Sequence, residues 1–280
     1  MSQPERMREA IDAGTIGSRL WFYTNYHCNL ACSYCLTGSS PRSPRRLLDP
    51  DRILRIAADA PALGFEAFGV TGGEPLLVPG VPDLVARLAD IAPVTLLTNG
   101  TLFTPRMLRR FAPLAGRDVA VQISLDSADP AVNDAARGPG NHARVVDAVP
   151  RLVAMGVRVR IATTLEADAD DDELPALCAL HRSLGVPDTD HVVRQIVARG
   201  RAIETGLGVE AGEAELFPEL TLTADGAFWS PFGPTTVVGG GIDTALRVCE
   251  EIEPLVVPAG EFAARVARRA TGADALLGIR

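Results

Sequence analysis

The chain contains no lysine and no long apolar run. Its 27 Lys and Arg positions are all Arg, and 35 acidic residues outnumber them, so the formal net charge is −8. An acidic chain without a large basic patch argues against a nucleic-acid-binding protein, which must neutralise phosphates. Apolar runs such as LVVPAGEF end well short of the ~18 residues that a membrane span needs, so we expect no membrane partner.

The N-terminal stretch MSQPERMREAIDAG lacks the apolar segment of a secretory signal, so we expect a cytoplasmic, reducing location. Cysteine is scarce, with five in 280 residues. In a reducing compartment these cysteines are interpreted as metal ligands or reactive thiols before disulfides. A hydrophobic content of 47% excludes a disordered chain and suits a single α/β core.

Short β-rich runs alternate with helical segments along the first 200 residues. Helical segments begin with capping or Pro signals and several end at Gly. Each strand and helix pair takes about 30 residues, the size of one βα crossover unit. The six predicted strands are Arg19–Tyr26, Ala67–Gly73, Pro93–Gly100, Asp118–Asp126, Val157–Glu166 and Thr189–Ala198. The predicted helices are 49–64, 80–92, 104–115, 141–156 and 170–185.

Six consecutive βα units predict an α/β fold, a partial (β/α)6 TIM-like barrel over residues 19–200, behind a lead-in of residues 1–18. The rhythm changes after Arg201, and residues 201–280 are predicted to form a small C-terminal α+β extension that packs on the barrel. In it we expect a hairpin over 220–232 with its turn at Asp225–Gly226, and helices over 239–254 and 261–274.

Three cysteines, Cys28, Cys32 and Cys35, follow the first strand with C-x3-C-x2-C spacing. Three thiols cannot close a tetrahedral zinc site without a fourth ligand. The candidates are His27, which is adjacent to Cys28 and expected to point away from it, and the distant Cys178 and Cys249. A cubane iron–sulfur cluster normally takes four thiolates, so three would leave one iron open. From spacing alone, both a zinc site and an open cluster stay possible.

Polar residues follow three further strands at the same predicted rim. They are Gly72-Gly73-Glu74-Pro75, Thr98-Asn99-Gly100 and Ser124-Leu125-Asp126. Each of these short motifs alone is more typical of a turn than of a ligand site. Because the carboxyl ends of parallel strands meet at one rim, their order along the chain predicts a ligand-binding mouth.

The cysteine motif, with Tyr34 before its last Cys, resembles the signature of the radical S-adenosylmethionine (SAM) superfamily. In that family three thiolates hold a [4Fe-4S] cluster, and the amino and carboxylate groups of SAM bind the fourth iron. The resemblance implies that Cys28, Cys32 and Cys35 are the metal ligands. It further implies a SAM-binding set comprising Tyr34, Gly72, Gly73, Glu74, Pro75, Thr98, Asn99, Ser124, Asp126 and Arg160.

The cations within the barrel have two interpretations. Arg160 and Arg194 lie on predicted strands among apolar residues, where a buried Arg needs an anion. The resemblance favours the SAM carboxylate for Arg160, while a substrate carboxylate or an internal salt bridge to Asp126 or Glu166 is the alternative. Arg137 is a weaker candidate for the same role.

The resemblance implies reductive cleavage of SAM to a 5′-deoxyadenosyl radical, which abstracts a hydrogen atom from a small-molecule or peptide substrate. An external flavodoxin- or ferredoxin-type donor would supply the electron. The later segments resemble the SPASM-type branch, but Trp229-Ser230-Pro231-Phe232 stands where auxiliary-cluster cysteines usually begin. We therefore expect one cluster, with the tail as a lid or substrate wall. The alternatives are an activase that places a radical on a partner protein and a zinc-stabilised, non-enzymatic binding module.

Overall fold

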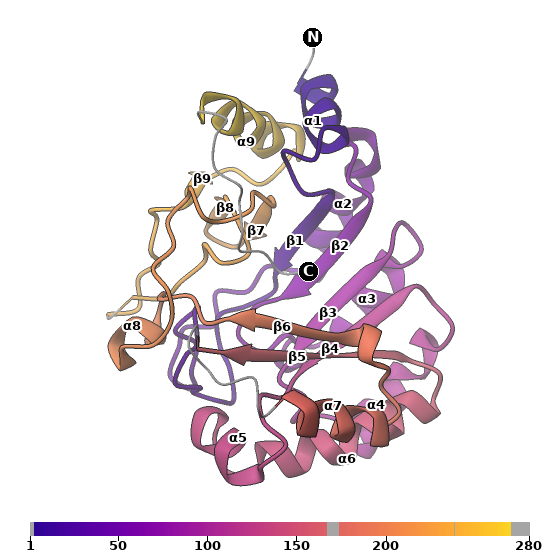
Figure 1. The fold of residues 1–280 in the computed structure, drawn as a ribbon. Coiled ribbons are helices and arrows are strands. Elements are labelled where there is room, and N and C mark those ends of the chain that lie inside the picture. Colours follow the sequence, from indigo (N-terminus) through magenta and orange to yellow (C-terminus); the bar gives the residue numbers. More distant parts are fainter. Residues whose placement is uncertain (1–2, 167–173, 238, 270–280) are drawn as a thin grey trace.

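A sheet whose first six strands are parallel, β1 to β6, forms the centre of the molecule (Figure 1). The structure is a computed structural model that describes residues 3–166, 174–237 and 239–269. All six predicted strands are confirmed, each shorter than its sequence run, and β6 has half the predicted length. They are β1 Arg19–Tyr23, β2 Ala67–Thr71, β3 Val94–Thr98, β4 Val119–Ser124, β5 Arg158–Leu165 and β6 His191–Gln195.

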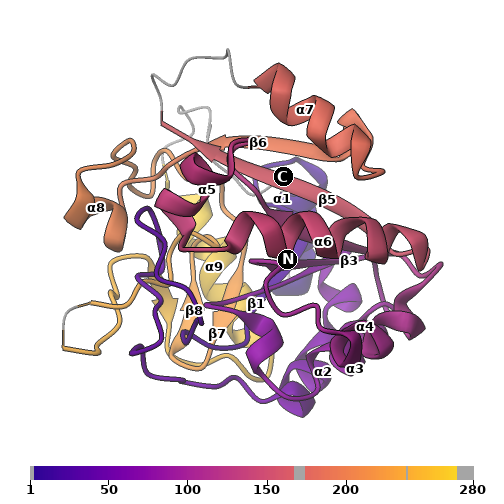
Figure 2. The ribbon, with the colours of Figure 1, turned by 90° about the horizontal axis from the view of Figure 1, so that it is seen from below.

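The six strands pair in sequence order, and helices cover the outer face of their sheet. Parallel registers such as Tyr23 with Thr71 and Ser124 with Ala162 align the carboxyl ends at one rim. This is the predicted partial barrel, with β6 at one edge of the sheet. Figure 2 shows the helices in their layer outside the sheet, with α6 crossing in front. These helices are α2 Pro50–Asp59, α3 Val81–Leu88, α4 Pro105–Phe111, α5 Pro130–Arg137, α6 Asn141–Ala154 and α7 Leu174–Ser183.

Side-chain caps explain where several helices begin. Asp49 accepts hydrogen bonds from the backbone N–H groups of Asp51 and Arg52 at the start of α2, and Thr104 accepts one from Met107 at the start of α4. Such caps satisfy N–H groups that have no partner within the helix. The expected start of α7 at residues 170–173 lies outside the described residues. Short 3₁₀ turns at Pro61–Leu63, Pro75–Leu77, Ala112–Leu114 and Asp188–Asp190 complete the connections.

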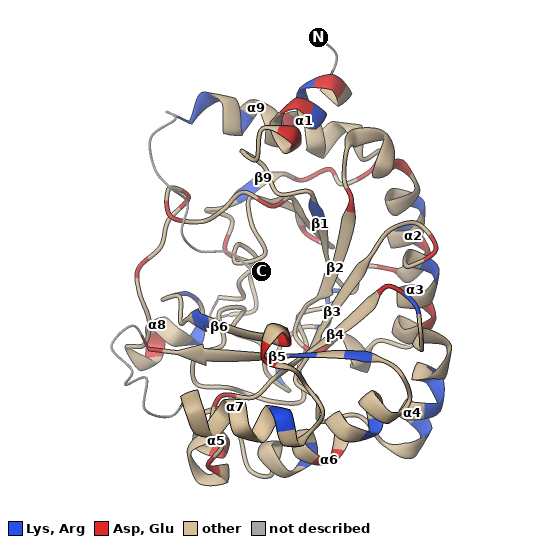
Figure 3. Ribbon diagram, turned by 45° about the vertical axis from the view of Figure 1, so that its right-hand side comes forward, with Lys and Arg blue, Asp and Glu red and all other residues tan. Residues whose placement is uncertain are grey.

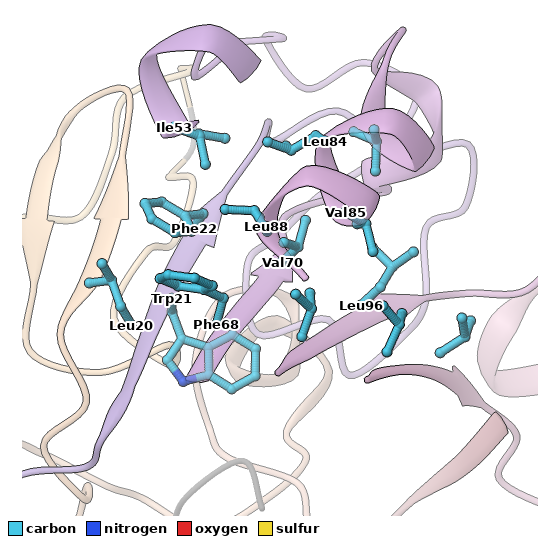
Figure 4. Close-up of a cluster of buried hydrophobic side chains, with 14 of the residues drawn as sticks. Leu20, Trp21, Phe22, Ile53, Phe68, Val70, Leu84, Val85, Leu88 and Leu96 are labelled. Carbon is cyan, nitrogen blue, oxygen red and sulfur yellow. The ribbon is translucent and has the colours of Figure 1, made fainter. Parts of the chain in front are cut away.

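The core fills both faces of the strands. Figure 4 shows Phe22, Phe68 and Val70 beside Leu84 and other residues of α3, on the helix side of the sheet.

Because side chains alternate along a strand, Trp21 points into the barrel instead. Gly69 makes room for it: a Cβ there would lie 2.1 Å from Trp21 Cε3. Trp21 is fully buried and fills the barrel below the rim.

The C-terminal extension continues the sheet beyond β1. β7 Thr221–Thr223 pairs in parallel with β1, and β8 Gly226–Phe228 and β9 Arg247–Cys249 follow in antiparallel order. The predicted hairpin is confirmed, but its turn is Ala224–Asp225, because Thr223 pairs with Gly226.

The predicted helix over 239–254 is wrong, since part of that segment forms β9. Gly239 and Gly240 have positive φ angles, which interrupt a helix, and Asp243 accepts from the N–H of Ala245 in a turn.

The two ends of the described chain pack together. Helix α1, Gln3–Asp12, arises within the expected lead-in and lies against α9, Val256–Arg268, as Figure 1 shows. Met7 of α1 is fully buried, and Gly260 of α9 approaches Gln3 closely. Helix α9 begins before the predicted position, and the predicted residues 270–274 lie outside the described residues. The lead-in is therefore part of the folded body.

The outer surface carries both signs of charge. In Figure 3, acidic and basic segments are interspersed along the outer helices. Within the described ranges, no helix has both the length and the apolar character required to cross a bilayer.

Candidate active site

The three motif cysteines lie in the loop after β1 and face one cavity of about 150 Å³. Cys28 is buried, and Cys32 and Cys35 are half-buried. The remaining walls come from other residues of the cysteine loop, from the carboxyl ends of the barrel strands, from Arg137 of α5 and from Phe232 of the extension. Among the described residues that line this cavity, these three are the only cysteines, and no histidine is present.

Backbone hydrogen bonds fix the cysteine loop. The N–H of Cys28 donates to the Ser40 carbonyl at 3.2 Å, and that of Cys35 donates to the Cys32 carbonyl at 3.2 Å. His27 lies with its Nδ1 3.3 Å from the carbonyl of Ser43 and outside the cavity wall. Burial raises the pKa of Cys28 to about 12 and that of Cys32 to about 11. Because a metal binds the thiolate, metal loading must displace protons from these thiols.

The three cysteine thiols match the number of protein ligands that an open cubane cluster takes. No three Cys, His, Asp or Glu side chains in the described part of the chain are arranged to hold one metal ion. The thiols instead surround a shared space. A cubane binds each thiolate at a different iron, so its ligands need not converge on one point. Three thiolates and an unfilled corner are therefore compatible with this arrangement.

The Gly72-Gly73-Glu74-Pro75 turn packs directly against the start of the cysteine loop. A Cβ on Gly73 would lie 2.3 Å from the carbonyl oxygen of His27, so only glycine allows this approach. Asn25 holds the turn through its side chain: its Nδ2 donates to the Glu74 carbonyl at 3.1 Å, and its Oδ1 accepts from the Gly73 N–H at 3.2 Å. Gly72 and Gly73 thereby present backbone to the cavity.

The Glu74 carboxylate is turned away from the cavity. It is fully buried and accepts from Leu76 N at 3.0 Å, Thr98 Oγ1 at 2.8 Å and Asn99 N at 2.8 Å. Burial raises its pKa to about 7, although these three donors favour the ionised form. In this arrangement Glu74 ties the second strand end to the third.

The Asp126 carboxylate links the end of β4 to the cysteine loop, to α5 and to the end of β5. Its carboxylate accepts from Arg137 Nε at 2.6 Å and Nη2 at 3.3 Å, from Thr164 N at 2.9 Å, and from the Tyr34 hydroxyl. Arg137 also lies 5.3 Å from the centre of the Tyr34 ring. Burial alone would lower the pKa of Arg137, but Asp126 more than offsets this, so the pKa is raised. Tyr34, between two of the cysteines, is thus anchored to the barrel.

The arginines of the barrel differ in whether their side chains line the cavity. Arg194 and Arg137 line the cavity. Arg194 Nη1 is buried with no hydrogen-bond partner among the described residues, and burial lowers its pKa. Arg160 lies two residues before Ala162, the β5 residue that pairs with Ser124, and it is not among the described residues of the cavity wall. Burial lowers the pKa of Arg160, and Asp190 partly offsets this effect.

The cavity wall contains some of the residues predicted to bind the cofactor and omits others. Those in the wall are Tyr34, Gly72, Gly73, Thr98, Asn99 and Ser124. Those outside it are Glu74, Pro75, Asp126 and Arg160. Glu74 and Asp126 accept hydrogen bonds from protein donors, Pro75 begins a buried 3₁₀ turn, and Arg160 pairs with Gln122, two residues before the position of Ser124.

Several wall residues were not predicted from the sequence. Tyr23 shares the inward face of β1 with Trp21, so strand alternation alone could have identified it. Thr164 could have been found in the same way at the end of β5. Phe232 comes from the extension, and no local pattern marks it. Cys178 and Cys249 lie outside the wall: Cys178 Sγ is 3.6 Å from His191 Nδ1, and Cys249 donates to the Glu251 carbonyl.

Comparisons with known proteins agree on the family. A family profile described as the radical SAM superfamily matches residues 23–178, more than half of the chain. The mycofactocin maturase MftC of Mycobacterium tuberculosis is 35% identical over 179 residues, covering 62% of this chain and 44% of that protein. A GTP 3′,8-cyclase of Chlorobaculum tepidum is 34% identical over 160 residues, covering 55% and 47%. The chain thus spans about half the length of the curated relatives it matches.

Solved structures share the fold. Streptococcus suis SuiB bound to precursor peptide SuiA aligns with a TM-score of 0.59 and 17% identity, covering 76% of this chain and 47% of that one. Native anSMEcpe with bound AdoMet and Cp18Cys peptide aligns with a TM-score of 0.60 and 12% identity, covering 90% and 80%. At these identities the likeness establishes the architecture alone.

Proposed function

We propose, from the premise that this chain belongs to the radical SAM superfamily, that it is a SAM-cleaving enzyme with a single [4Fe-4S] cluster. Cys28, Cys32 and Cys35 would hold the cluster, and SAM would occupy its open corner. When bound and reduced, the cluster supplies the electron that cleaves SAM to methionine and a 5′-deoxyadenosyl radical, which abstracts a substrate hydrogen. The protein's part is to orient the reactants and exclude water.

One observation carries the proposal: three cysteines line the same cavity as the ends of six strands, and no fourth Cys or His is found among the described residues of its wall. A closed structural site would need a fourth protein ligand. Three thiolates leave room for an exchangeable ligand at the remaining metal corner. The cavity beside them has the polar groups and the apolar wall that a bound small molecule requires.

The chain's own groups have distinct proposed tasks at this site. The exposed backbone of Gly72 and Gly73 would receive the SAM ammonium, and Thr98 and Ser124 hydroxyls would contact its polar groups. Arg137 or Arg194 would face an anionic group, a role that the position of Arg160 does not favour. Apolar side chains such as Leu36 and Phe232 would keep water from the radical.

The substrate is proposed at the level of class. The relatives' names refer to a maturase of mycofactocin in one case and to a cyclase of GTP in another, and SuiB is described with a precursor peptide. We propose hydrogen abstraction from a small molecule or a peptide in a biosynthetic or maturation pathway, with an external flavodoxin- or ferredoxin-type electron donor. We further propose residues 19–200 as the catalytic barrel and 201–280 as an extension without cluster ligands.

Anaerobic reconstitution of the purified full chain with iron and sulfide tests this function. We expect about four irons per chain, the content of one cubane, a spectroscopic signal on reduction with dithionite, and 5′-deoxyadenosine when SAM is added. About eight irons would refute the single-cluster proposal. Stoichiometric zinc without SAM cleavage would instead support the binding module and overturn the enzyme.

A further inference from the structure

The cysteine loop is held from outside the barrel by residues 201–236. In Figures 1 and 2, helix α8, Arg201–Thr205, lies beside the loop that follows β1. Donors in this segment engage most of the loop's carbonyl oxygens. The carbonyls that accept from it are those of Cys32, Ser33, Cys35, Leu36, Thr37, Gly38 and Ser39.

Arg201 makes the largest share of these contacts. Its Nη1 donates to the Cys32 carbonyl at 2.7 Å, and its Nη2 donates to the carbonyls of Gly38 at 3.1 Å and Ser39 at 2.8 Å. Its backbone N–H donates to the Cys35 carbonyl at 3.0 Å. The planar guanidinium therefore spans the loop from one cysteine ligand to the residues past the next, which a Lys ammonium cannot reproduce.

The backbone before Arg201 is shaped for this approach. Gly200 has φ of +56°, and a Cβ there would lie 2.4 Å from the Leu36 carbonyl oxygen and 2.7 Å from that of Cys35. Thr205 Oγ1 donates to the Ser33 carbonyl at 3.0 Å from the other end of α8. The first and last residues of helix α8 thus both donate hydrogen bonds to the cysteine loop.

We propose that Arg201 is a positioning residue for the iron–sulfur cluster. It fixes the Cys32–Ser39 loop before metal arrives, and its cation favours the reduced cluster. The second part rests on the proposed function, because it requires the cluster. The first part concerns the polypeptide alone and stands or falls independently.

The charge argument follows from the electron that the cluster receives. Reduction adds one negative charge close to the thiolates. A guanidinium within hydrogen-bond distance of the carbonyl of a ligand residue stabilises the more negative state and raises the reduction potential. Tyr34 and Arg137 brace the same loop from the barrel side, so Arg201 supplies the opposing support.

Three variants of the full chain separate these effects. Arg201→Gln removes both the fork and the charge, and Arg201→Lys keeps the charge but cannot make the same three carbonyl contacts. Arg199→Gln is the matched control, because Arg199 donates to the Gly233 carbonyl at 3.2 Å and pairs with Asp243 at 2.7 Å, both within the extension. It weakens the extension without removing a contact to the cysteine loop.

Hydrogen exchange of the metal-free protein tests the positioning. We expect residues 32–39 to lose protection by about tenfold or more in both Arg201 variants, with Arg199→Gln retaining it. Wild-type protection in Arg201→Gln overturns the proposal. Equal loss in Arg199→Gln also overturns it, because the loop would then respond to the stability of the whole extension.

Redox titration of the reconstituted proteins tests the charge. We expect a more negative midpoint potential in Arg201→Gln than in wild type, with Arg201→Lys close to wild type. Equal potentials in the Gln and Lys variants overturn the electrostatic part. If the wild-type chain takes up no cluster, the proposed function fails, while the exchange measurement still decides whether Arg201 fixes the loop.

Discussion

Replacing Asp126 with Asn tests the central ion pair of the site. The side chains of Asp126 and Arg137 are only 9% and 5% exposed, and their closest N–O distance is 2.6 Å. Asn has a single acceptor oxygen, so it can keep the bond from either Tyr34 or Thr164, which reach different oxygens of Asp126, and it leaves the Arg137 cation buried without a counter-charge. Breaking a buried pair in this way destabilises a protein by about 3–5 kcal/mol.

A second ion pair on the same barrel, with a similar distance but an exposed arginine, serves as the control for the effect of burial. Asp190 pairs with Arg158 at 2.6 Å as well, but the Arg158 side chain is 60% exposed. Water can solvate that Arg after the change, so Asp190→Asn is expected to lower the free energy of unfolding by about 1 kcal/mol or less. The difference between the two variants isolates the effect of burial from that of the substitution itself.

Urea unfolding of the metal-free proteins, followed by circular dichroism, measures both changes. The double variant Asp126→Asn with Arg137→Met removes the stranded cation and should recover much of the loss, since apolar replacement of a buried pair is close to neutral. The reasoning is refuted if Asp126→Asn loses no more stability than Asp190→Asn. It is also refuted if the double variant is as unstable as the sum of its single changes.

Three other predictions address the ligands, the barrel interior and pH. Alanine at Cys28, Cys32 or Cys35 should reduce bound iron and 5′-deoxyadenosine formation to background, whereas Cys249→Ala should leave both near wild type; iron retained in a ligand variant would contradict the assignment. Gly69→Ala places a Cβ 2.1 Å from Trp21 Cε3 and should lower the free energy of unfolding by about 1–3 kcal/mol in urea titrations, with a smaller loss in a Trp21→Leu background. Burial raises the pKa of Glu219 from 4.5 to about 7, so the folded state holds a proton that the unfolded chain releases. The contribution of Glu219 to the free energy of unfolding therefore falls as pH rises from about 4.5 to about 7 and is level above pH 7. Glu219→Gln should flatten this slope in urea midpoints measured across pH. An unchanged slope in the variant would contradict the assignment to Glu219.

The repeated βα pattern and the strand-end motifs are local features, and they were enough to predict much of this protein. Short β-rich runs marked all six barrel strands, and capping signals such as Asp49 marked helix starts, because both depend on neighbours within a few residues. The C-x3-C-x2-C spacing placed three thiols on one loop. The helix expected over 239–254 failed because its composition suits a helix, while Gly239 and Gly240 and pairing with β8 favour a turn and a strand.

Distant partners of the site residues could be seen only in the tertiary structure. The strand pattern predicts that Glu74 and Asp126 follow strands, but whether a carboxylate faces a ligand or a protein donor depends on what packs beside it. Here Thr98, Asn99, Tyr34 and Arg137 supply those donors. The sequence likewise placed the three cysteines of the proposed cluster site at the rim, whereas Arg201, more than 160 residues from the loop it contacts, acquired its place only through folding. Hydrogen bonds and ion pairs act over a few ångströms in space, so chain order alone does not specify them.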